Sequence, residues 1–316
     1  MAVMTQEAPA ALAARPPRRF TVRVTPKLIT GVVLAGAIVL FGVLGPLLVG
    51  NPSTVRDIGL SGPSGEHLLG TTQTGQDVLA QLAHATRGSL TIGLVVGVLT
   101  LVLSAFFGIV GTFAGGGWDE GFSLFSNVML VIPGLPLVIV ISSYVPDKSI
   151  WLIAVVLAIT SWAGSARVLR WYTLSLRNRD YVLAARVAGE KRWRILAVEI
   201  LPNLIPLLAS QVVLAIIAAI LGEAGLSYLG LGPNSSITWG SILNDAQSGQ
   251  ALGRGAWWWF VPPGLLLAVF GAALSLINFS IDEIINPKLR AQTRAVRKKW
   301  RMSRSQIVGR GEEATV

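Results

Sequence analysis

The feature that most constrains the fold of this chain is a series of long segments that carry almost no Asp, Glu, Lys or Arg. A bilayer core about 30 Å thick is spanned by roughly 20 helical residues, at a rise of about 1.5 Å per residue. We therefore expect six transmembrane helices, over about 28–50, 88–114, 122–143, 149–169, 203–222 and 258–281. The run 224–244 is also free of charge, but its Gly, Pro, Asn and Ser residues predict a loop with short helical pieces.

The composition agrees with a membrane protein. Charged residues make up 13% of the chain, against about 25% in a soluble domain. The low charge excludes a disordered chain and most soluble enzymes. The absence of Cys excludes structural disulfides and thiolate metal sites.

The basic residues predict the orientation. Of the 26 Lys and Arg residues, 22 fall in the N-terminal tail, the loop after the fourth span and the C-terminal tail. With six spans these segments share one side, which the positive-inside rule makes cytoplasmic. The net charge of +10 then reflects membrane orientation and not nucleic-acid binding. We expect an all-α, multi-pass protein of the plasma or inner membrane with both termini in the cytoplasm. A disordered basic tail (1–27), a six-helix domain (28–285) and a second basic tail (286–316) would make up the chain.

The predicted spans show no arrangement of residues for catalysis. An enzyme or proton-coupled carrier working inside a bilayer needs ionisable groups at depth, and the interiors of these spans have none. The two histidines, His67 and His84, lie in the loop after the first span, and no HExxH, GxSxG or GxxxxGK[ST] motif occurs. The sequence thus predicts a chain that is not an enzyme, binds no cofactor or metal, and holds or passes a solute unchanged.

The loop between the fourth and fifth spans is the most informative segment. A helical pattern over 180–188 ends at Gly189, and a second, basic and amphipathic stretch covers 191–200. Pro202 marks the entry into the fifth span. The pattern predicts helix–Gly–helix along the cytoplasmic surface. On composition alone, a lipid-bound amphipathic helix and a partner-binding loop fit equally well.

A family resemblance favours the partner-binding loop. Ala184-Ala185, Gly189 and Leu201-Pro202 resemble the EAA loop of ABC-importer permeases, whose pattern is E-A-A-x3-G-x9-I-x-L-P. The sequence departs from this pattern at Leu183, where the family has Glu, and at Glu199, where it has Ile.

Other segments are similar to the dipeptide/oligopeptide group of these permeases, and specifically to its C-type subunit. The segment 67–71 with Gly75-Gln76-Asp77 resembles the group's H-P-L-G-T-D…G-R-D, and 226–232 and 287–290 also fall where the group has related residues. The resemblance covers roughly 28–290, although 278–280 replaces a stretch that is usually rich in Gly and Asp.

The resemblance implies a transmembrane permease subunit that forms half of the translocation path of an ATP-driven importer for di- and oligopeptides. Its partners would be a second homologous permease subunit, two cytoplasmic ATPase subunits or domains that bind ATP and Mg, and an extracytoplasmic substrate-binding protein. The loop would be a coupling helix that docks onto the ATPase. Its candidate residues are Tyr181, Ala184, Ala185, Arg186, Gly189, Glu190, Lys191, Leu201 and Pro202.

Two features on the outer side allow alternatives. Glu223, at the far end of the fifth span, either lines the mouth of the path, where the family has an acidic residue, or caps the helix in water. Trp257, Trp258 and Trp259 open the sixth span, where we expect an aromatic belt.

Two other functions remain open at this point. Related permeases share these motifs, so the solute could be nickel or another small molecule. A protein of a different class, a helical membrane scaffold whose basic loop binds a soluble partner, would also fit the composition.

Overall fold

The computed structural model describes residues 25–55, 58–146 and 148–285. Within these residues the chain is helical apart from its loops and one β-bridge, between Thr71 and Asp77. Five helical stretches are long and apolar enough to cross a membrane, and a bent pair of helices makes a sixth if the pair is counted as one span. The all-α membrane class is confirmed. Of the expected tails, only 25–27 are described, where the first helix begins.

The helices follow one another in the order of the predicted spans. The spans are α1 (Pro26–Leu48), α2 (Val78–Ala105) with its continuations η1 (Phe106–Val110) and α3 (Gly111–Ala114), α4 (Gly117–Val131) with α5 (Gly134–Tyr144), α6 (Ile150–Arg177), α9 (Leu201–Tyr228) and α11 (Trp257–Ile285). The shorter elements are α7 (Asp180–Val187), α8 (Arg192–Arg194), η2 (Ile195–Ile200) and α10 (Trp239–Ser248).

The second span begins well before the predicted residue 88. Asp77 caps α2, because its carboxylate accepts a hydrogen bond from the Ala80 amide at 3.0 Å. The same carboxylate lies 2.7 Å from His67 Nδ1. The prediction placed the start of the span directly after the charged residue Arg87. It therefore missed the turns from Val78 to Arg87, because Arg87 lies inside the helix.

The third span is not the single straight helix predicted over 122–143. It consists of α4 and α5, which meet at an angle of 73°. Pro133 has no amide hydrogen for a helical bond and disfavours helical backbone in the residue before it. Accordingly, Ile132 is extended, with φ −71° and ψ 120°.

The fifth span begins before the predicted proline. The basic stretch after Gly189 is helical, as expected, but it runs through α8 and η2 into α9 without a break, as one helical stretch over Arg192–Tyr228. Pro202 falls in the first turn of α9, directly after the π-helical η2. The wider π turn shifts the backbone hydrogen-bond register, so this proline does not end the helix.

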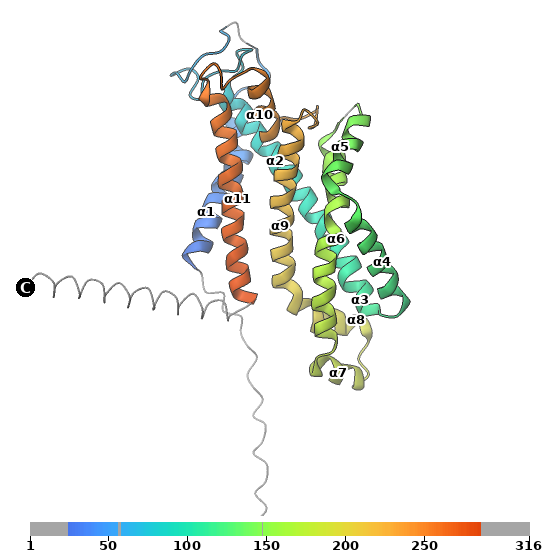
Figure 1. Cartoon of the computed structure of the whole chain (residues 1–316). Helices are drawn as coiled ribbons and strands as arrows, with labels where there is room; N and C mark the ends of the chain where they lie inside the picture. Colours follow the sequence, from blue (N-terminus) through green and yellow to red (C-terminus); the bar gives the residue numbers. More distant parts are fainter. Residues whose placement is uncertain (1–24, 56–57, 147, 286–316) are drawn as a thin grey trace, which may run out of the picture.

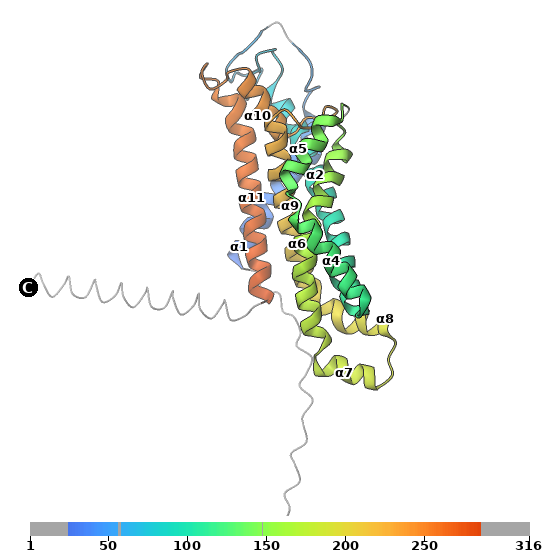
Figure 2. The same cartoon turned by 45° about the vertical axis from the view of Figure 1, so that its right-hand side comes forward.

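The helices form an elongated bundle with α10 at one end and α7 and α8 at the other (Figure 1). We call these the α10 end and the α7 end. The first turn of α1 and the last turn of α11 lie together at the α7 end, where Lys27 Nζ is 3.0 Å from Glu283 Oε1. In the middle of the bundle α2 packs against both α6 and α9 (Figure 2). Both ends of the described chain therefore reach the same end of the bundle, as an even number of spans requires.

Candidate functional site

The predicted coupling loop has a well-defined backbone. Helix α7 ends in a Schellman motif, in which the amide of Glu190 donates to the carbonyl of Ala185 at 3.1 Å and that of Gly189 to Arg186 at 3.0 Å. Gly189 itself has φ +77°, a conformation that favours glycine. A Cβ atom at this position would meet nothing within 4 Å. Glycine is thus required for the backbone turn and not for space, and the helix–Gly–helix prediction is confirmed.

One side of α7 anchors the loop and the other is exposed. Val182 is fully buried in an apolar cluster with Leu169 of α6, Ile200 of η2 and Leu204 of α9. On the other side Val187 is 90% exposed, and Tyr181 and Leu183 are each more than 40% exposed. Ala184 is exposed and Ala185 is half-buried. Exposed apolar side chains grouped at the tip of a loop are typical of a surface that another protein covers.

Two charged residues of the loop, Arg186 and Glu190, contact other side chains of this chain. The guanidinium of Arg186 lies over the ring of Phe113, 6.0 Å from its centroid. Glu190 pairs with Arg194 at 3.6 Å, and Lys191 is exposed. Partial desolvation raises the pKa of the Tyr181 phenol, an effect that Arg179 opposes and Glu199 reinforces. Tyr181 therefore stays neutral near pH 7.

The second half of the predicted motif, Leu201 and Pro202, follows α8 and η2 at the start of α9. Leu201 and Pro202 are exposed at the junction of η2 and α9. The residue before them, Ile200, is fully buried in the same cluster as Val182. The structure therefore joins the two halves through Val182 and Ile200, which the motif does not contain. The apolar positions within an otherwise polar loop were the signal that could have identified them.

At the α10 end Glu223 belongs to a buried polar network. It is fully buried, and its Oε1 accepts a hydrogen bond of 2.5 Å from Ser227 Oγ. The Ser227 hydroxyl in turn accepts from Thr238 Oγ1 at 3.3 Å. Among the described residues Glu223 Oε2 has no hydrogen-bond partner. The alternative of a helix cap in water is wrong, because this carboxyl does not reach solvent.

The network continues into α2 through the first residue of α10. The amide of Trp239 donates to Ser89 Oγ and its indole Nε1 to Thr86 Oγ1, each at 3.0 Å. Thr238 caps α10 through a reciprocal capping box with Ser241. The α10 end is therefore held by buried side-chain hydrogen bonds between three helices.

The tryptophan run is only partly an aromatic belt. Trp257 is 53% exposed, as a belt residue would be. Trp258 is half-buried and its Nε1 donates to the carbonyl of Thr71 at 3.2 Å. Trp259 is 4% exposed and packs inside the chain. The belt prediction is wrong for Trp259, because three successive helical residues cannot all face one side.

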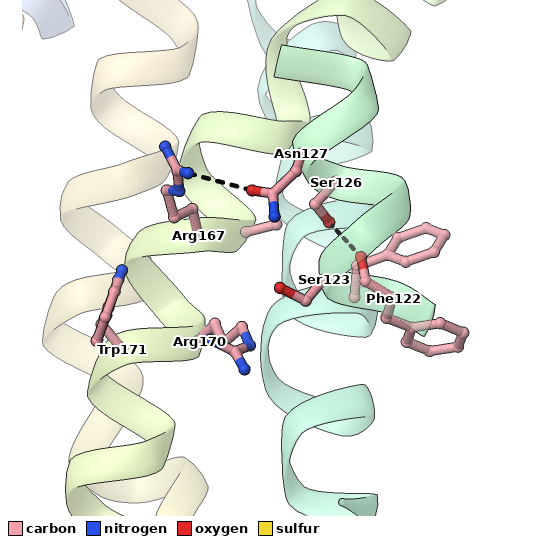
Figure 3. Close-up of a pocket in the computed structure, with 9 residues that line it drawn as sticks. Phe122, Ser123, Ser126, Asn127, Arg167, Arg170 and Trp171 are labelled. Atoms are coloured by element: carbon pink, nitrogen blue, oxygen red, sulfur yellow. Dashed lines mark hydrogen bonds between the residues drawn. The ribbon is translucent and has the colours of Figure 1, made fainter. Parts of the chain in front are cut away.

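Two of the three arginines of α6, which extends beyond the predicted end of the fourth span, contact α4. Arg167 Nη2 donates to Asn127 Oδ1 at 3.1 Å across a pocket between α4 and α6 (Figure 3). Arg170 makes two hydrogen bonds with the carboxylate of Asp119, at 2.8 and 3.1 Å. This bidentate pair fixes the start of α4 to α6. Within the described residues no group of three or more His, Asp or Glu side chains could hold a metal ion.

The fold and the loop define a class of protein, a multi-pass helical membrane protein with an exposed loop at one end of its bundle. Residues 101–291 match the family described as binding-protein-dependent transport system inner membrane component. The chain belongs to this family, so it is a multi-pass inner-membrane protein and a component of a transport system.

Curated relatives agree with this assignment. The chain is 31% identical over 231 residues to the dipeptide transport system permease protein DppC of Bacillus subtilis, covering 72% of this chain and 71% of the relative. It is 30% identical over 223 residues to the oligopeptide transport system permease protein OppC of Lactococcus lactis, covering 70% and 76%. A putative peptide transport system permease protein of Brucella suis is 33% identical over 269 residues, covering 83% and 88%.

Proposed function

We propose that this chain is a permease subunit that forms half of the translocation path of an ATP-driven importer for dipeptides and oligopeptides. The names of its relatives support peptides over nickel and over a membrane scaffold. Both termini and the α7 end lie in the cytoplasm in this proposal, and the α10 end faces the binding protein. The distribution of basic residues supports that orientation.

The proposed complex supplies what this chain lacks. A second homologous permease completes the path, and an extracytoplasmic binding protein delivers the peptide. ATP and Mg bind to two cytoplasmic ATPase subunits or domains, which carry out hydrolysis. The chain itself binds no cofactor and passes the peptide without covalent chemistry.

The observation that carries the coupling proposal is that α7 is buried on one side and exposed on the other. Val182 fixes the helix to α6, η2 and α9, while Tyr181, Leu183 and Val187 are left for a partner. An ATPase subunit docked on the exposed side would displace α7 when its dimer closes. The buried side would transmit this displacement to the two spans that flank the loop. In this proposal Ala184 and Ala185 allow close approach, and Arg186, Glu190 and Lys191 set the register through charge.

The coupling proposal is tested by replacing Gly189 with valine in the reconstituted complex. A β-branched residue at this positive φ costs about 1–3 kcal/mol, so we expect peptide uptake per ATP hydrolysed to fall about tenfold or more. Gly164→Val is the matched control, because Gly164 is a helical residue of α6 with open space at its Cβ and no positive φ.

Uptake and ATP hydrolysis are measured on the same vesicles. Normal uptake by the Gly189→Val complex would show that the loop is not the coupling element. Failure of the wild-type complex to take up labelled di- and oligopeptides would instead contradict the peptide assignment and leave the coupling role standing.

For Glu223 we propose a position beside the extracytoplasmic mouth of the path. Because the carboxyl is buried beneath Thr238 in this structure, it would reach the path only when the segment before α10 moves. Glu223→Gln keeps the hydrogen bond from Ser227, so reduced uptake with unchanged thermal stability would support this position. Unchanged uptake would contradict it.

A further inference from the structure

The pocket between α4 and α6 is a polar site that neither the coupling loop nor Glu223 explains. Its lining includes Ser123 and Asn127 of α4 and Arg167 of α6. Figure 3 shows the Asn127 amide facing Arg167 and the Ser123 hydroxyl pointing from α4 toward α6. Asn127 and Arg167 are exposed, and Ser123 is half-buried. These side chains therefore offer polar groups at the surface of the bundle.

Arg167 gives the pocket a net positive charge. Arg170 also lines it, but the bidentate pair with Asp119 neutralises that guanidinium. Arg167 takes part in no ion pair among the described residues, and its hydrogen bond there goes to the amide oxygen of Asn127 at 3.1 Å. A guanidinium has more N–H donors than one such bond uses. The remaining donors of Arg167 are available to an anion.

Exposed tryptophans indicate where the pocket lies in the membrane. On α6, Trp151 is 60% exposed and Trp171 is 64% exposed. The helix between them is about 30 Å long, which is about the thickness of the hydrocarbon core. Because Trp favours the membrane interface, Trp171 and the exposed Trp118 in the first turn of α4 mark the interface on the α7 side. Arg167 lies about one helical turn from Trp171, within reach of the lipid headgroups.

Apolar side chains continue from the pocket along α4. Leu124 and Val128 directly follow Ser123 and Asn127 in the sequence, and both are exposed. An acyl chain can lie along them while a headgroup lies at Arg167. Basic pockets between transmembrane helices at a membrane surface are typical sites for anionic lipid headgroups. The combination of an unpaired cation with an adjacent apolar surface therefore favours a lipid over a free anion.

We propose that Arg167, Asn127 and Ser123 bind the phosphate group of an anionic phospholipid in the leaflet on the α7 side. The guanidinium of Arg167, the Nδ2 amide of Asn127 and the hydroxyl of Ser123 donate to the phosphate oxygens. Leu124 and Val128 contact the acyl chain. The proposal concerns the lipid around this subunit and does not depend on which solute the transporter carries.

The test measures photolabelling of this subunit in the full transporter complex. The complex is placed in phosphatidylcholine nanodiscs that contain a small fraction of phosphatidylglycerol with a diazirine in its acyl chain, and peptide mass spectrometry locates the label. We expect label on α4 near Leu124 and Val128. Phosphatidylcholine that carries the same diazirine, at the same fraction, should label α4 about fivefold less, because one arginine near an anionic lipid contributes about 1 kcal/mol.

Variants and an internal reference make the result specific. Arg167→Gln should lower the phosphatidylglycerol label on α4 about fivefold, to the level that phosphatidylcholine gives. Arg167→Lys, which keeps the charge, should retain most of the label. Arg192→Gln removes an exposed arginine of α8 that does not line this pocket and should leave the label unchanged. Label near the exposed Leu265 of α11 reports lipid elsewhere and should not respond to these substitutions.

The opposite results would overturn the proposal. Equal labelling of α4 by the two lipids, or full labelling of the Arg167→Gln complex, would exclude recognition of an anionic lipid. Loss of the label on addition of inorganic phosphate would show a site for a free anion, and loss on addition of Ala-Ala would show that the pocket faces the substrate path. Absence of label on α4 would show that another subunit covers the pocket. Peptide uptake is measured separately, so none of these results alters the import proposal.

Discussion

The two ends of the bundle are held together in different ways. At the α10 end, buried hydrogen bonds join Thr238 to Ser227 of α9 and Trp239 to Thr86 of α2, and Ser227 also donates to Glu223 within α9. At the α7 end, helix α7 is fixed mainly by one apolar side chain, Val182. Its other large apolar side chains, those of Tyr181, Leu183 and Val187, are exposed.

This difference suggests that the α10 end stabilises the folded chain and that the α7 end serves the assembly of the complex. A polar network that is fully buried resists separation of its helices, because each broken hydrogen bond leaves an unsatisfied group. An exposed apolar surface contributes little to the stability of the isolated chain and becomes useful when a partner covers it. We therefore expect substitutions at the α10 end to affect folding first, and those at the α7 end to affect the complex.

The largest expected effect compares two tryptophans. Trp239→Ala removes a fully buried side chain that donates to Thr86 and packs edge-on against Phe270, and it should destabilise the chain by about 3–5 kcal/mol. Trp193→Ala, at a 67% exposed position of α8, should change stability by less than about 0.5 kcal/mol. Thermal unfolding of the detergent-solubilised chain measures both. Similar losses from the two variants would remove the distinction between the ends.

A smaller effect is expected at a close helix contact of the α10 end. A Cβ atom at Gly240 would lie 2.6 Å from the carbonyl oxygen of Ala224, a backbone atom that cannot turn aside. Gly240→Ala should therefore cost about 1–3 kcal/mol through overpacking. Gly225→Ala is the control, since its Cβ meets nothing within 4 Å and alanine favours helix. The same thermal assay would contradict the prediction if Gly240→Ala melted no lower than Gly225→Ala.

The smallest effect concerns the pH dependence of stability at Asp245 on α10. Partial burial raises the pKa of this carboxyl above the ordinary value of 3.8, so the folded chain holds its proton to a higher pH than the unfolded chain does. Its contribution to stability is therefore present at low pH and is lost as the pH rises through the folded-state pKa. Asp245→Asn should accordingly melt higher than the unchanged chain at neutral pH, and this difference should shrink as the pH falls. A difference in thermal unfolding that does not vary with pH would contradict this prediction.

The sequence predicted the class of the fold because the relevant signal is local. A span needs only a charge-poor run of sufficient length, and the six predicted runs all contain a helix. Gly189 was predictable for the same reason, since a glycine after a helical pattern is the usual residue for a positive φ. The predictions failed where hydrophobic length does not report the residue that matters. Pro133 bends the third span, and Asp77 caps α2 ten residues before the charged residue Arg87.

The tertiary structure alone decided which side chains meet. Glu223, Ser227, Thr238 and Trp239 are close in the sequence, but the hydrogen bonds of Trp239 to Thr86 and Ser89 depend on how α2 packs against α9 and α10. A pocket lined in part by Gln81, Asp245 and Trp259 likewise lies between α2, α10 and α11.

What the sequence determined by itself was therefore the all-α membrane class and the position of the helix–Gly–helix loop, because hydrophobic length and backbone conformation are properties of short segments. Burial of a carboxyl and convergence of distant polar groups are properties of packing. Only the folded bundle could decide these two properties.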